Sequence, residues 1–66
     1  MVHNITAQDL IVGDYVPELG GNVVTITESV RPGTGEVAGL FVTTAGVAGD
    51  QTHLVPLGQA FLAHLA

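Results

Sequence analysis

β-branched residues and frequent chain breakers are what most constrain the fold of this chain. Ten valines, seven threonines and three isoleucines make up 20 of its 66 residues. Such side chains favour the pleated, half-buried surface of a sheet. Nine glycines and three prolines divide the sequence into short segments, which is typical of a small barrel or sandwich. We therefore predict one all-β domain over residues 1–66.

The segments predict five strands and one short helical turn. Thr6 and Asp9 have the spacing of a capping box, which favours a helical turn near residues 6–9. Arg31–Glu36 is rich in turn residues and predicts a hairpin of residues 23–30 with residues 37–44. The C-terminal segment, residues 57–66, is consistent with a strand or with two helical turns, and a closing strand agrees better with the rest. The predicted strands cover residues 10–16, 23–30, 37–44, 52–56 and part of 57–66.

The segment 23–30 has the clearest strand pattern. Its apolar face carries Val24, Ile26 and Val30, and its hydroxylated face carries Thr25, Thr27 and Ser29. This alternation predicts a sheet with one solvated side. Glu28 interrupts the apolar face. It is either a residue at the edge or mouth of a barrel, or a carboxylate aimed at a ligand.

A shortage of charge points to a covered surface. Hydrophobic residues make up 47% of the chain and charged residues 11%, against about 25% charged residues in a typical soluble domain. With no cysteine, neither a disulfide nor a thiolate-bound metal can stabilise so small a core. We therefore predict self-association. The alternative is that alanine and glycine, which tolerate exposure, inflate the apolar fraction.

Two apolar segments are the candidates for that contact. The centre of residues 37–44 is apolar on both faces, which predicts that both faces are covered. The second candidate is the C-terminal segment from Phe61 to Leu65. Either segment would serve as packed surface or as an added edge strand. The predicted interface residues are Leu40, Phe41, Val42, Phe61, Leu62 and Leu65.

The charge balance excludes some partners and suggests another. The chain contains six acidic residues and only one lysine or arginine, Arg31, and its net charge is −5. Phosphate backbones and anionic membranes are therefore disfavoured as partners, and we expect neither nucleic acid nor membrane binding. The alternative to self-association is a monomeric acidic adaptor or inhibitor of a basic protein. It would present Asp14, Glu18, Glu36 and Asp50.

The sequence also resembles a known group of folds. Leu10-x-Val12-Gly13-Asp14-x-Val16, the central hairpin and Thr52-His53-Leu54-Val55-Pro56 together resemble small SH3-like β-barrels, including KOW-type modules. The Val-Gly-Asp opening and the His-x-Val-Pro closing strand are also similar to short uncharacterised proteins of actinobacteria and their phages. The resemblance implies a five-stranded SH3-like barrel and a phage assembly or host-interaction role. With no targeting signal evident, we expect the host cytoplasm or the virion.

No motif predicts an enzyme or a cofactor. The first-strand motif also resembles self-splicing Hint domains, but this chain lacks the cysteine that acts as their nucleophile. Ser29 is the only serine and has no histidine near it in sequence. The histidines His3, His53 and His64 are scattered, so at most a weak site with Asp9 or Asp50 is conceivable. We predict no catalytic, cofactor-binding or metal-binding residue.

Overall fold

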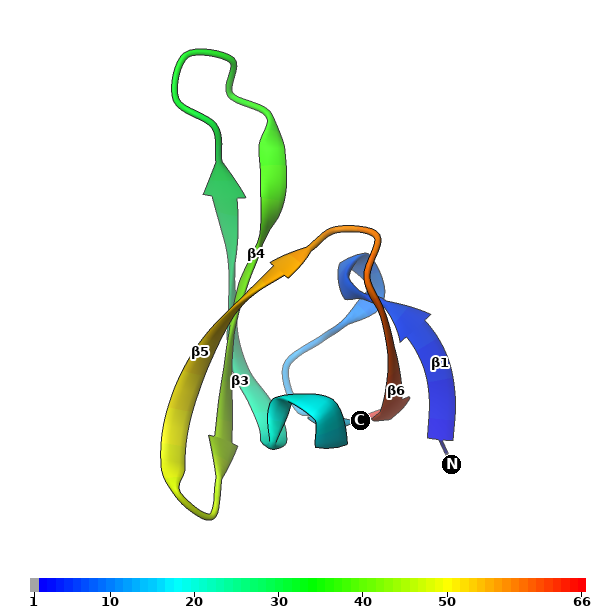
Figure 1. Ribbon diagram of the computed structural model, residues 1–66. Coiled ribbons are helices and arrows are strands. Elements are labelled where there is room, and N and C mark those ends of the chain that lie inside the picture. The colour runs from blue at the N-terminus through cyan, green and yellow to red at the C-terminus, as the bar shows by residue number, and fades with distance from the viewer. Residues whose placement is uncertain (1) are drawn as a thin grey trace.

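Six antiparallel strands and two single 3₁₀ turns account for the regular structure in the computed structural model, which describes residues 2–66 (Figure 1). The hydrogen-bonded order is β1-β6-β2-β3-β4-β5, so β1 and β5 are free edges and the sheet is not closed. The all-β class is confirmed, with six strands in place of the predicted five. The elements are β1 (Val2–Thr6), η1 (Ala7–Asp9), β2 (Tyr15–Val16), η2 (Pro17–Leu19), β3 (Gly21–Val30), β4 (Val37–Gly46), β5 (Gly49–Pro56) and β6 (Ala60–His64).

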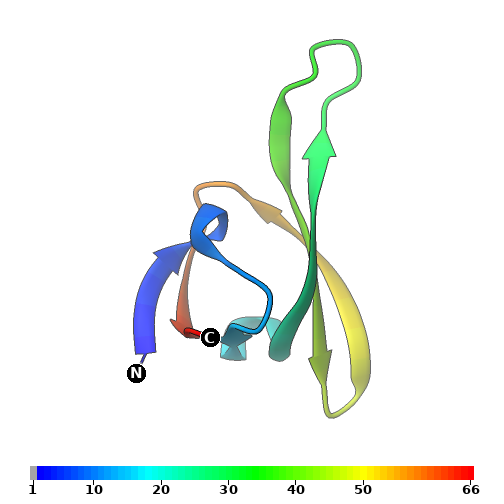
Figure 2. The same ribbon diagram turned by 180° about the vertical axis from the view of Figure 1, so that it is seen from behind.

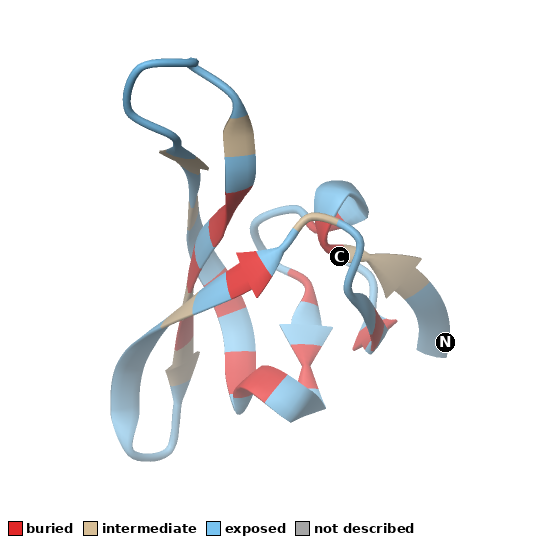
Figure 3. Cartoon of the chain, turned by 45° about the horizontal axis from the view of Figure 1, so that its top comes forward, coloured by how far each residue is buried: buried red, intermediate tan, exposed pale blue. Residues whose placement is uncertain are grey.

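One face of the sheet supplies the core. The half formed by β3, β4 and β5 faces the half formed by β1 and β6 (Figure 1). Buried and exposed residues alternate along β6 and along parts of β3 and β4, as the sheet period of two requires (Figure 3). Each fully buried large apolar side chain contributes about 1.5–3 kcal/mol through its removal from water. The core consists of Ala7, Leu10, Val16, Leu19, Val23, Leu40, Val42, Val55, Phe61 and Ala63.

The central hairpin is confirmed and is longer than predicted. β3 and β4 have ten residues each, and their outer ends and the loop 31–36 project beyond the rest of the fold (Figures 1 and 2). We call this projecting part, residues 27–40, the arm. A β-bulge between Val23 and Thr25 changes the predicted alternation. Val23 takes the core position and is 1% exposed, whereas Val24 is 38% exposed.

The second hairpin turns more sharply than the sequence indicated. Residues 45–51 were expected to form a loop, but only Val47 and Ala48 lie outside the strands. Gly46 pairs with Gly49 across this two-residue turn. Gly49 has a φ of 104°, a conformation that glycine adopts without steric cost and that tight hairpin turns need.

Near the N-terminus the structure corrects the predicted strand over residues 10–16. Only Tyr15 and Val16 pair as β2, and the preceding residues form a turn. Gly13 has a φ of 103°, and the Asp14 N–H donates to the Ile11 carbonyl at 3.2 Å. The Gly13 N–H donates to the Val23 carbonyl at 2.9 Å and the Val23 N–H donates to the Asp14 carbonyl at 2.8 Å, so the turn is joined to β3 next to β2. The predicted helical turn near residues 6–9 is confirmed as η1, and the C-terminal segment is confirmed as a strand, β6.

Asp14 is the most unusual residue of the core. Its side chain is 0% exposed, so the predicted presentation of this carboxylate to a partner is wrong. Its Oδ2 accepts the Ile11 N–H at 3.1 Å, and its Oδ1 accepts the Ala66 N–H at 2.8 Å. A buried carboxylate is tolerated when such donors satisfy it. Asp14 therefore links Ala66 to the turn before β2 by hydrogen bonds.

Candidate functional site

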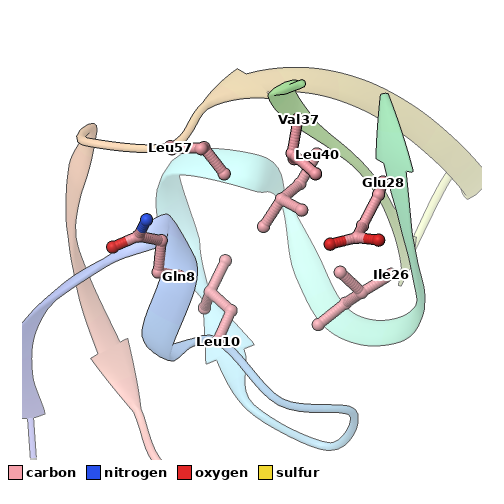
Figure 4. A pocket seen from close by; sticks show the side chains of 7 residues that line it. All are labelled: Gln8, Leu10, Ile26, Glu28, Val37, Leu40 and Leu57. Atoms are coloured by element: carbon pink, nitrogen blue, oxygen red, sulfur yellow. The ribbon is translucent and has the colours of Figure 1, made fainter. Parts of the chain in front are cut away.

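An apolar pocket opens between the arm and the first 3₁₀ turn (Figure 4). Its volume is about 440 Å³, which is within the range of small-ligand sites. Two polar side chains, those of Gln8 and Glu28, stand among the apolar ones, and the Glu28 carboxylate extends into the pocket (Figure 4). The apolar walls are Leu10, Ile26, Val37, Leu40 and Leu57.

Sheet register explains how Glu28 comes to line this pocket. Ile26 pairs with the buried Val42, and Glu28 pairs with the buried Leu40. Side chains two residues apart point to the same face of a strand, so Glu28 continues the core-facing row of β3. It lies on the arm, where the opposite half of the sheet no longer covers that face, and its side chain remains exposed. The predicted interruption of the apolar face by Glu28 is thus confirmed.

The chain contains few basic side chains that could pair with the Glu28 carboxylate of the pocket. Arg31 is the only lysine or arginine among 66 residues that include six acids. A single guanidinium cannot neutralise the acidic surface, and most carboxylates have no lysine or arginine partner in this chain. The pocket therefore combines apolar walls with a carboxylate that an external cation can reach.

A second surface lies on the outer face of β3, β4 and β5. Phe41 is directly opposite Leu54 in the register of β4 and β5, and these side chains are 40% and 63% exposed. The next row is hydroxylated: the Oγ1 atoms of Thr43 and Thr52 are 2.8 Å apart. We call Phe41, Leu54, Thr43 and Thr52 the outer patch.

The outer patch adjoins a free strand edge. In a two-residue hairpin, hydrogen-bonded and non-hydrogen-bonded pairs alternate from the pair that flanks the turn. Counted from Gly46 and Gly49, the residues Asp50, Thr52 and Leu54 belong to non-hydrogen-bonded pairs. Their N–H and C=O groups therefore point away from β4, toward the open side of β5. Pro56, which has no N–H, ends this edge.

The predicted interface residues divide into two groups. Leu40, Val42 and Phe61 are at most 8% exposed and belong to the core of the chain itself. The exposed members are Phe41 at 40%, Leu62 at 53% and Leu65 at 45%. The outer patch brings Phe41 together with Leu54, a residue outside the predicted set. Leu62 lies on β6, where it pairs with Asn4 of β1.

The buried polar groups of β4 and β5 have structural partners. The Thr44 hydroxyl donates to the Leu19 carbonyl at 2.8 Å and lies 3.2 Å from Nε2 of His53. Because its one proton is used toward Leu19, Nε2 of His53 must be the donor in the second bond. This chain of bonds ties η2 to β4 and β5.

The remaining histidines do not assemble a metal site in the part of the chain that the structure describes. His3 pairs with Ala63 and is therefore next to His64 in the β1–β6 ladder, but adjacent ladder positions face opposite sides of a sheet. The His64 ring instead packs near Tyr15, with ring centroids 5.7 Å apart. Within residues 2–66, no three histidine or acidic side chains group as ligands. In the same range, no helix has the length and apolar character needed to cross a membrane.

Comparison with known proteins adds no relative to this picture: neither a family model, nor a curated protein, nor a solved structure matches the chain.

Proposed function

We propose that this chain is a non-enzymatic protein-interaction module that self-associates through the outer patch and the free edge of β5. The observation that carries the proposal is the pairing of Phe41 with Leu54 on an uncovered sheet face. Exposed apolar side chains that adjoin one another mark interaction surfaces better than scattered ones do. Here they also adjoin a row of free backbone donors and acceptors.

The edge is complementary to itself. If two β5 strands pair antiparallel about a two-fold axis at Thr52, each Thr52 faces its own copy and each Leu54 faces Asp50 of the other chain. The outward N–H and C=O groups of these residues then satisfy one another across the axis. Exposed edge strands join other chains in this way unless lysine, proline or a bulge blocks them. Within Asp50–Val55 no lysine or proline does so.

Leu54→Glu should convert the assembly to a folded monomer. A glutamate at this position would lie opposite Asp50 of the other chain, and like charges directly across two strands destabilise their pairing. Because Leu54 is 63% exposed, its replacement should change the free energy of unfolding by no more than about 0.5 kcal/mol. Light scattering gives the mass, and urea unfolding of the monomeric and assembled forms checks the fold.

Two matched variants locate the contact. Val47→Glu makes the same apolar-to-glutamate change in the β4–β5 turn and should leave the mass of the assembly unchanged. Leu62→Glu tests the predicted contact on β6. A native mass in Leu54→Glu, with dissociation only in Leu62→Glu, would move the interface to the β1–β6 side and overturn the outer patch.

We also propose the SH3-like relationship and a phage assembly or host-interaction role. The first is supported by an antiparallel sheet whose two halves enclose one core, with 3₁₀ turns between strands. The second is supported by the sequence resemblance alone.

A further inference from the structure

We propose that the pocket at the base of the arm binds the side chain of a lysine or arginine presented by a basic partner protein. This inference is independent of self-association through the outer patch, because Glu28, Leu40 and Ile26 lie on the opposite, core-facing side of β3 and β4. A lysine or arginine has a long hydrocarbon stem and a cationic end. The pocket provides a suitable surface for each part.

The apolar walls of the pocket suit the hydrocarbon stem of a lysine or arginine side chain. Leu10 comes from the turn after η1, Leu57 from the segment between β5 and β6, and Leu40 from β4, so apolar side chains approach from three directions (Figure 4). Long charged side chains bury their methylene groups along such surfaces and keep the charged end near water. A pocket of about 440 Å³ that is open to solvent accommodates this arrangement.

The Glu28 carboxylate suits the cationic end, because it extends into the pocket (Figure 4). A charge-assisted hydrogen bond to a carboxylate is stronger than one between neutral groups. An anionic ligand would instead be repelled by Glu28, and a purely apolar ligand would make no charge-assisted bond with the carboxylate.

The cation is expected from another protein because the chain offers almost none itself. It contains no lysine and one arginine, and its net charge of −5 attracts basic partners from a distance. A second copy of the chain could bring only Arg31 and would add five further negative charges. Charge complementarity therefore favours a foreign basic segment.

A peptide titration followed by ¹⁵N NMR tests the assignment. The probe is an acetylated, amidated heptapeptide with a lysine at its centre, and the matched control has norleucine, which keeps the stem and lacks the charge. The lysine peptide should shift the amide signals of Gln8, Leu10, Glu28 and Leu40, and the norleucine peptide should bind at least threefold more weakly. Equal binding of the two peptides, or shifts confined to the outer patch, would overturn the proposal.

Two variants separate the pocket from general charge attraction. Glu28→Gln and Asp50→Asn each remove one exposed carboxylate, but Asp50 lies beside the β4–β5 turn, at the far end of that hairpin from the pocket. Glu28→Gln should weaken lysine-peptide binding about three- to fivefold, the effect of a partly exposed ion pair. Asp50→Asn should change it less than twofold, and equal losses in both variants would show attraction without a site.

Dilution of the unliganded protein tests whether the pocket is instead occupied by Arg31 of a second copy of the chain. If the pocket signals move with protein concentration and Arg31→Gln abolishes that movement, the pocket holds Arg31 of a second copy, and a foreign partner is ruled out. Pocket signals that stay constant on dilution while the lysine peptide still shifts them support the proposal. Both results are distinct from a failure of self-association, which the mass of the protein reports.

Discussion

Phe61→Ala should remove a large part of the free energy of unfolding, about 3–5 kcal/mol. Phe61 is 1% exposed and is the largest fully buried side chain. It lies on β6, whose core-facing side packs against the half of the sheet that contains β3 and β4. Truncation of a buried phenylalanine costs about 3–5 kcal/mol, because apolar contacts are lost and a cavity remains. A domain of this length has about 3–10 kcal/mol of stability in total, so the change removes a large part of it.

The neighbouring residue provides the control. Leu62→Ala truncates an apolar side chain on the same strand, but Leu62 is 53% exposed and faces away from the core. Urea unfolding followed by circular dichroism should show a small change for Leu62→Ala and a lost or strongly lowered transition for Phe61→Ala. Equal stabilities of the two variants would contradict the placement of β6 over the core.

Asp14→Ala should be nearly as damaging, although it removes a charge from an acidic protein. Both carboxylate oxygens accept backbone N–H groups, from Ile11 and from Ala66. Both bonds are part-buried, so each donor left without its partner costs about 1–2 kcal/mol, the lower part of the range for buried groups. The variant should therefore lose about 2–4 kcal/mol of unfolding free energy, with the turn before β2 and the residues around Ala66 loosened first.

Asp14→Asn distinguishes the contribution of the hydrogen bonds to stability from that of the charge. The asparagine keeps one carbonyl oxygen, so it satisfies one donor and opposes the other with its NH₂ group. We expect a stability between those of Asp14→Ala and the natural protein. Amide hydrogen exchange should show faster exchange at Ile11 or Ala66 in both variants. An unchanged exchange rate at both residues would show that Asp14 does not hold them.

The fold was predictable where local patterns dominate. β-branched alternation and the turn residues at 31–36 identified the central hairpin, and the acidic residue three positions after Thr6 indicated η1. β1 was missed because Val2–Thr6 has little strand signal of its own and exists through its pairing with β6. Likewise, the side chain of Asp14 and the positive φ of Gly13 form a turn that bonds to β3 through Gly13 and Asp14, although the apolar sequence there favours a continuous strand.

The surface was harder to predict than the core. Sequence periodicity placed Leu40 and Val42 on one face of a strand and Phe41 on the other, but it did not show which face the chain covers itself. Leu54 was not predicted as an interface residue, because its proximity to Phe41 depends on the two-residue turn at Val47 and Ala48. Gln8 and Leu57 reach the pocket from segments between strands, where no periodic pattern applies.

Glu28 shows what the sequence could indicate about a binding site. Its position on an otherwise apolar strand face raised two interpretations, a solvated barrel mouth and a carboxylate aimed at a ligand. The structure combines elements of both: the residue is exposed, and its carboxylate extends into an apolar pocket (Figure 4). The geometry of the pocket alone does not indicate the chemistry of a partner. The shortage of lysine and arginine in the chain favours a basic partner.

The absolute mass of the natural protein, measured by light scattering over a hundredfold dilution, tests self-association most directly. One chain has a mass of 6.7 kDa. We predict a multiple of that mass at high concentration and a decline toward it on dilution, with Leu54→Glu at the mass of one chain throughout. A mass of one chain for the natural protein at every concentration would contradict self-association.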